Sequence, residues 1–178
     1  MYDTFKKLVM ERQSCRDFSD KPVSEQTLRE IAELAMFAPS ACNSQPWRMY
    51  IATDNDKVQA VAEAVQDRGH NKFASGVKAF IVVTDKTATL RPGTEAKFDR
   101  NHFVKYDVGE LVAYLTLAAK AKGVESCIIG WINPEKLKNA VGYPDDEICN
   151  IVVAFGYSNL PVREKLRKNK DEIIKTIR

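Results

Sequence analysis

The sequence predicts an α+β fold from two patterns that alternate along its 178 residues. Some segments carry apolar residues at helical spacing, while others are short apolar runs without alternation, as in strands buried on both faces. Hydrophobic residues make up 44% of the chain. At this mass, area scaling indicates that about 70% of the unfolded surface is buried on folding. We therefore expect helices packed on a sheet around a proper core.

The N-terminal half alternates helix and strand. Its first helix carries an apolar stripe of Phe5, Leu8 and Val9. A second helix follows Pro22 with Ser24 as its N-cap, because a serine oxygen can accept a hydrogen bond from the first turn. The Ala38-Pro39 pair ends that helix. The other expected elements are a strand over Met49–Ala52, a helix capped by Asp54 or Asn55 and closed by Gly69, and a central strand over Ala79–Thr84.

The C-terminal half begins with a long polar loop over residues 85–103. A helix follows over Val104–Lys122, and its apolar stripe is too broad for one exposed face, which predicts burial in a core or at a subunit interface. The remaining expected elements are a strand over Ser126–Ile129, a helix opened by Asn133-Pro134 and a strand over Ile148–Phe155. No repeat or linker divides the chain, so residues 1–178 are expected to be one domain, with 157–178 a basic tail outside the core.

Composition and charge exclude several classes of protein. Lys+Arg 27 against Asp+Glu 24 leaves a net charge of +3, far below the excess expected of a nucleic-acid-binding chain. The longest apolar runs, Ala79–Val83 and Ile151–Phe155, are far shorter than the ~20 residues that span a bilayer. Charges interrupt the apolar positions of the N-terminus, unlike a secretory signal. We therefore expect a cytoplasmic protein with no membrane or nucleic-acid partner.

Cysteine and histidine patterns give no catalytic or metal centre. The sequence has no C-x-x-C pair and no H-E-x-x-H, G-x-S-x-G, Walker A or G-x-G-x-x-G motif. His70 and His102 stand beside no matching Cys or Ser motif, so a His-dependent nucleophile is not expected. The cysteines are expected to be reduced and structural: Cys15, Cys42, Cys127 and Cys149. A redox cofactor remains a good source of chemistry, because a flavin performs hydride transfer itself and needs only binding and tuning.

The first segment whose side chains could bind a ligand is Arg12-Gln13-Ser14-Cys15-Arg16, just past the first helix. An extended backbone points alternate side chains the same way, so Arg12, Ser14 and Arg16 would share one side. Two guanidinium groups and a hydroxyl suit a phosphate-bearing cofactor. The alternative is a solvated polar connector.

The second segment runs from Ala38 to Trp47, with two prolines around hydroxyl and amide side chains. Prolines restrict the backbone, and the polar groups can both donate and accept hydrogen bonds. Such groups match the polar edge of an isoalloxazine ring. The alternative is an ordinary helix-to-strand loop with a core tryptophan.

Taken in this order, about 25 residues apart, the two segments resemble the FMN-dependent nitroreductase family. The resemblance continues through Asp107-Val108-Gly109, the stretch Ser126–Trp131, the strand Ile151–Gly156 and the basic tail, and so covers nearly the whole chain. It implies a three-layer α-β-α fold with a central, mostly antiparallel sheet flanked by helices, and a homodimer with two equivalent FMN sites at the subunit interface.

The resemblance also implies which residues contact FMN. Arg12 and Ser14 of one subunit are implied near the phosphate and ribityl chain, and Arg16 near flavin N1/O2. From the partner, the implied contacts are Pro39, Ser40 and Ala41 on the isoalloxazine, with Asn43 and Gln45 shaping its polar surroundings.

Further implied contacts come from the end of a strand and from the tail. The main chain of Ile129 and Gly130 is implied near flavin N5, where glycine permits close approach. Lys165 and Arg167 resemble tail residues that reach the phosphate, although a solubilising tail is the alternative. Gln13 belongs to the same segment and replaces a common second arginine. Tyr114 and Glu125 also depart from the family pattern, which leaves the substrate preference open.

The implied activity is hydride transfer from NADH or NADPH through bound FMN to a small planar acceptor, such as a nitroaromatic or a quinone. No residue is expected to be catalytic in its own right, because the flavin carries the chemistry. Two alternatives remain. One is another flavin reaction on the same fold, such as reductive dehalogenation or flavin-consuming chemistry, and the other is a flavin-binding sensor or store without turnover.

Overall fold

The structure is a computed structural model that describes residues 1–177, and its centre is an antiparallel sheet. The strands of the described residues are β1 (Trp47–Ala52), β2 (Ala79–Asp85), β3 (Glu125–Ile129) and β4 (Ile148–Gly156), in the order β1-β2-β4-β3. Each neighbouring pair is antiparallel. β2 is therefore an interior strand, as the unbroken apolar run over Ala79–Thr84 predicts.

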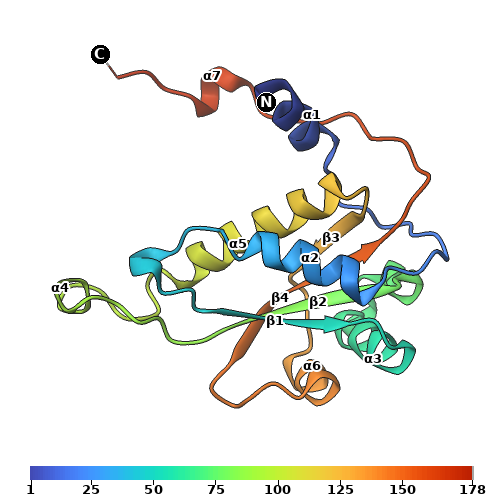
Figure 1. The fold of residues 1–178 in the computed structure, drawn as a ribbon, viewed down its shortest axis with the longest axis horizontal. Coiled ribbons are helices and arrows are strands. Elements are labelled where there is room, and N and C mark those ends of the chain that lie inside the picture. The colour runs from blue at the N-terminus through green and yellow to red at the C-terminus, as the bar shows by residue number, and fades with distance from the viewer. Residues whose placement is uncertain (178) are drawn as a thin grey trace.

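Helices cover both faces of the sheet (Figure 1). α2 (Glu25–Ala35) and α5 (Val104–Ala121) lie on one face, and α3 (Asn55–Val65) and α6 (Pro134–Val141) lie on the other. Alternate residues of β2 point to opposite faces, so Ile81 packs in one core and Phe80 in the other. The three-layer α-β-α arrangement is thus confirmed.

The helix signals in the sequence are mostly confirmed. Ser24 caps α2 by accepting a hydrogen bond from the Thr27 N–H, and Asn133 caps α6 in the same way through Lys136 N–H. The expectation that Gly69 closes the third helix is wrong. α3 ends at Val65, and Gly69 lies in a separate 3-10 turn over Asp67–Gly69, where it adopts a positive φ.

The loop over residues 85–103 holds one short helix, α4 (Pro92–Glu95), which Pro92 opens. The broad apolar stripe on α5 packs in the core of the same chain, because Leu111 and Leu115 are fully buried there. The exposed side of α5 carries Tyr106 and Tyr114 instead, at 66% and 44% exposure.

Two segments lie away from the layers (Figure 1). α1 (Tyr2–Glu11) has an apolar stripe, yet none of its residues is buried in the described part of the chain. The tail after β4 is largely exposed and holds only the short α7 (Lys170–Ile173). Among the described residues, no helix is sufficiently long and apolar to cross a bilayer.

A buried carboxylate ties β1, β2 and the loop before β4 together. The Glu147 side chain accepts hydrogen bonds from Thr84 Oγ1 at 2.6 Å and Tyr50 OH at 2.7 Å, and Lys86 Nζ lies 3.4 Å from its other oxygen. Burial alone raises the pKa of Glu147, but these donors outweigh burial and hold the pKa below its ordinary value of 4.5. The network therefore stabilises the fold with Glu147 ionised.

We predict that Tyr50→Phe destabilises the protein by about 1–2 kcal/mol at neutral pH, because it removes one hydrogen bond to a charged group. A lowered folded-state pKa contributes stability that is present above about pH 4.5 and is lost as the pH falls through the folded-state value. Urea unfolding at pH 7 and pH 3 should therefore show a smaller loss at pH 3. Tyr143→Phe is the control, because the Tyr143 hydroxyl bonds a neutral carbonyl, Pro134 O. An equal loss for Tyr50→Phe at both pH values would contradict the prediction.

Candidate functional site

Residues 12–16 leave α1 and run beside the outer edge of β3. Ser14 forms a parallel bridge with Ser126, and Cys15 N donates to Ser126 O at 2.9 Å. Burial alternates along the segment, with Gln13 and Cys15 buried and Arg16 exposed. Arg12, Ser14 and Arg16 therefore share the more open side of the segment, as an extended backbone predicts.

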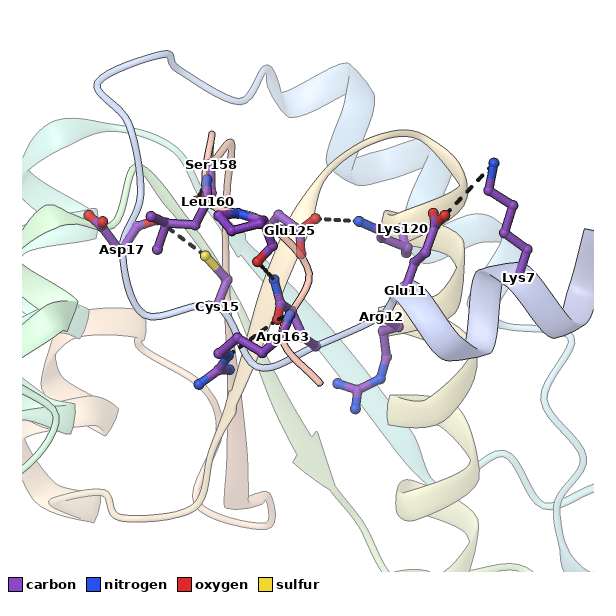
Figure 2. Close-up of polar contacts among 12 residues, drawn as sticks. Lys7, Glu11, Arg12, Cys15, Asp17, Lys120, Glu125, Ser158, Leu160 and Arg163 are labelled. Atoms are coloured by element: carbon purple, nitrogen blue, oxygen red, sulfur yellow. Dashed lines mark hydrogen bonds and ion pairs between the residues drawn. The ribbon is translucent and has the colours of Figure 1, made fainter. Parts of the chain in front are cut away.

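The C-terminal tail crosses the same segment from the other side (Figure 2). Lys165 Nζ donates to Arg12 O at 2.6 Å, and Arg163 Nη2 donates to Ser14 O at 2.7 Å. Arg167 is exposed and its guanidinium bonds only its neighbour, Leu166 O, among the described contacts. The structure thus brings Lys165 to the predicted segment, adds Arg163, and leaves Arg167 without a contact there.

Cations gather where the tail meets the segment. Burial lowers the pKa of Lys165, and the positive charges of Arg12, Arg167 and Arg163 lower it further. The nearby carboxylate is Glu125, whose Oε1 is paired with Lys120. Its Oε2 is buried and has no partner in the described residues. The local excess of positive charge would favour a bound anion.

The end of β3 lies next to this cationic cluster. Ile129 is buried and pairs with Val152, while Gly130 directly after the strand is exposed. A Cβ at Gly130 would meet nothing within 4 Å in the described protomer. Burial raises the pKa of the Cys127 thiol on β3, and the positive charge of Arg16 opposes that rise.

The second predicted segment forms a tight loop between α2 and β1. Cys42, Asn43 and Gln45 all have positive φ, a conformation that residues other than glycine rarely adopt. Two side chains hold the loop in this shape. Ser40 Oγ accepts from Gln45 N at 3.0 Å, and Ser44 Oγ accepts from Thr89 N at 2.9 Å.

Asp107, in the first turn of α5, also binds this loop. Its Oδ1 accepts from Ala41 N at 3.0 Å, and its Oδ2 is buried without a partner in the part of the chain that is described. Burial raises the pKa of Asp107. The neighbouring Cys42 thiol donates to Thr94 Oγ1 at 3.7 Å, and the Arg91 N–H lowers its pKa. This loop leaves Pro39, Asn43 and Gln45 exposed.

One protomer does not bring the two predicted segments together. The 39–45 loop is bound to Asp107 near the start of α5, whereas Lys120 near its end pairs with Glu125 beside the 12–16 segment. At 1.5 Å per residue, these two positions on α5 are about 20 Å apart. The two segments are therefore attached toward opposite ends of α5.

Sequence reasoning missed Arg163 and Asp107 as organisers of the two segments. Arg163 carries no signal that distinguishes it from Lys165, Arg167 or Lys168 in the same tail. Asp107 was noted only as part of a motif, although an acidic residue in a first helical turn is a common sequence signal. The expectation of reduced cysteines agrees with four free thiols. The described residues contain no cluster of three or more His, Cys, Asp or Glu that could hold a metal.

Comparisons with known proteins find relatives that match most of the chain. The model of the family described as "Nitroreductase family" matches residues 9–69 and 57–157. A nitrobenzene nitroreductase from Ectopseudomonas oleovorans is 37% identical over 196 aligned positions, covering 85% of this chain and 86% of the relative. An oxygen-insensitive NADPH nitroreductase from Helicobacter pylori is 26% identical and covers 95% of this chain and 94% of its own.

A solved structure shows the same fold. A protein from Exiguobacterium sibiricum, determined in complex with FMN, superposes with a TM-score of 0.85 at 19% identity over 97% of each chain. The family model spans both predicted segments, the helix between them and the strand beside them. The chain therefore belongs to the nitroreductase family.

Proposed function

We propose that this protein is an FMN-dependent oxidoreductase that passes a hydride from NADH or NADPH through bound FMN to a small planar acceptor. A nitroaromatic is the acceptor class that its relatives favour, because two of them are named nitrobenzene and NADPH nitroreductase. A quinone is the other planar acceptor of the same chemistry. When bound, FMN supplies the hydride chemistry itself, so the protein's own residues bind, orient and tune it.

The observation that carries the proposal is the cationic cluster on the 12–16 segment. Burial and the charges of Arg12 and Arg163 lower the pKa of Lys165, and the carboxylate of Glu125, which opposes this shift, is already paired with Lys120. A phosphate relieves the mutual repulsion of these cations and can accept hydrogen bonds from Arg12 and Lys165. The donor set therefore fits the phosphate of FMN.

The remaining contacts are proposed by position. The phosphate end is bound by Arg12, Ser14, Lys165 and Arg167, and Gln13 lies behind these residues. Arg16 binds the pyrimidine edge of the flavin. The main chain of Ile129 and Gly130 lies against the centre of the ring, where the absence of a Cβ contact at Gly130 leaves room. The partner's copy of the 39–45 loop supplies the other half: Pro39, Ser40, Ala41, Asn43 and Gln45.

A homodimer follows from the same proposal, and exposed surface supports it. The protomer exposes 11432 Å², whereas a globular monomer of 20.1 kDa exposes about 8,700 Å². Apolar side chains contribute to this excess on α1 and on the outer side of α5, including Phe5, Val9 and Tyr114. A second copy that covers these faces would bury the surface and join two half-sites.

The first test is spectroscopic. We expect the purified protein to show flavin absorption that NADH or NADPH bleaches in a stopped-flow mixing experiment. Addition of a nitroaromatic or quinone should restore the absorption rapidly. Bound flavin that does not respond to either nicotinamide would contradict the oxidoreductase proposal and indicate a sensor or store. Bleached flavin that these acceptors do not reoxidise would indicate another reaction on the same fold.

We also predict that dimerisation and FMN binding are linked, since each chain holds only half of a site. Tyr114→Glu places a charge on the exposed side of α5 and should lower both the dimer fraction and the FMN occupancy. Analytical ultracentrifugation and flavin absorption measure the two quantities. Asn139→Glu adds the same charge on α6, an exposed position of the opposite layer, and should change neither. A monomeric Tyr114→Glu protein with normal FMN affinity would refute the shared site.

Arg12 and Arg16 should have separable effects. We predict that Arg16→Gln lowers the midpoint potential of bound FMN by roughly 20–45 mV, because a cation at the N1/O2 edge stabilises the negative charge of two-electron reduction by about 1–2 kcal/mol. Arg12→Gln should weaken FMN binding and leave the potential nearly unchanged, because its proposed partner is the remote phosphate. Spectroelectrochemical titration of both FMN-saturated variants measures this. If Arg16→Gln loses only affinity, both arginines serve as phosphate anchors.

A further inference from the structure

The buried side chain of Gln13 fastens the C-terminal tail to the 12–16 segment. Gln13 is only 7% exposed, and both ends of its amide are used. Its Nε2 donates to Pro161 O at 3.3 Å. Its Oε1 accepts from Arg163 N at 3.1 Å and from Arg163 Nε at 3.3 Å. One amide thus holds both ends of the stretch 161–163.

Arg163 completes the attachment through the main chain of the segment. The peptide between Ser14 and Cys15 points its N–H and its C=O in opposite directions, because a trans peptide is planar. The N–H bonds Ser126 O of β3 at 2.9 Å, and the C=O accepts from Arg163 Nη2 at 2.7 Å. This peptide is therefore held between the sheet and the tail.

We propose that Gln13 and Arg163 form a clasp that positions Arg12, Ser14 and Arg16 for the cofactor phosphate and flavin edge. The proposal rests on the proposed function, since it assigns these two residues a role in FMN binding. They are positioning residues. The guanidinium of Arg163 is engaged at Nε and Nη2 by protein oxygens, and Gln13 points away from the open side that Arg12, Ser14 and Arg16 share.

The chemistry of the clasp is specific to these residue types. A lysine at 163 keeps the charge, but a single ammonium cannot reproduce the planar fork that reaches Gln13 Oε1 and Ser14 O together. An arginine at 13 has five donors and no acceptor, so it cannot accept from Arg163 at all. Arg163→Lys keeps the charge and Gln13→Arg adds one, but both break the clasp. These two variants therefore distinguish a positioning role from direct electrostatic attraction of the phosphate.

The first experiment needs no cofactor. Limited chymotrypsin digestion of the FMN-free protein should cut the tail after Leu166, which is 85% exposed. We expect Gln13→Ala, Gln13→Arg, Arg163→Ala and Arg163→Lys to raise the cleavage rate by about 5- to 10-fold, because each removes between one and three of the hydrogen bonds that hold the tail. Lys168→Ala, an exposed tail position outside the clasp, should not change it. Cleavage unchanged in all four variants would overturn the clasp.

The second experiment measures FMN affinity by fluorescence titration. The same four variants should weaken FMN binding by about 5- to 10-fold. The double variant Gln13→Ala/Arg163→Ala should bind FMN as tightly as either single alanine variant, because both substitutions break the same attachment of the tail. Normal affinity in Arg163→Lys with weak binding in Arg163→Ala would show that Arg163 acts by charge and would overturn the positioning role. A wild-type protein that does not bind FMN would overturn the proposed function and the positioning role together. The proteolysis result would still decide whether the clasp exists.

Discussion

The ladder between β2 and β4 fixes the location of every other part of the candidate site. Both strands are apolar on both faces, so helices must cover the sheet above and below. Antiparallel pairing of β4 with β3 then leaves the outer edge of β3 free. The 12–16 segment occupies that edge through the bridge between Ser14 and Ser126. An open strand edge is a liability, and here the site segment itself protects it.

Close packing at the end of β4 also fixes the path of the chain that follows the 12–16 segment. A Cβ at Gly156 would come within 2.6 Å of Phe18 Cδ1, so only glycine lets the chain after the segment cross there. Ser19 N next donates to Tyr157 O at 2.7 Å. The chain from Ser14 to Ser19 is therefore held against β3 at one end and beside the end of β4 at the other, where the tail begins. This explains how residues about 150 positions apart in sequence come to share hydrogen bonds.

Local signals in the sequence predict most of the fold and only half of the site's organisation. Ser24 and Asn133 are short-range caps, and their effects are confined to the next turn, so the sequence reveals them directly. The unbroken apolar run over Ala79–Thr84 likewise reveals an interior strand. The prediction for Gly69 is wrong because Gly69 belongs to a separate 3-10 turn that follows α3. The contact of Gln13 with Arg163 leaves no local pattern, because it depends on where the tail passes after the whole sheet has formed.

The 39–45 loop shows how the fold prepares a binding surface before any ligand arrives. Cys42, Asn43 and Gln45 hold left-handed conformations that cost about 1–2 kcal/mol each for such residues. Asparagine tolerates this region through its short polar side chain, but cysteine and glutamine do not. The hydrogen bonds from Ala41 N to Asp107 and from Gln45 N to Ser40 offset that cost. Because the loop is already shaped, a flat ring that packs on Pro39 and Ala41 does not have to order it, and less binding free energy is lost to immobilising the chain.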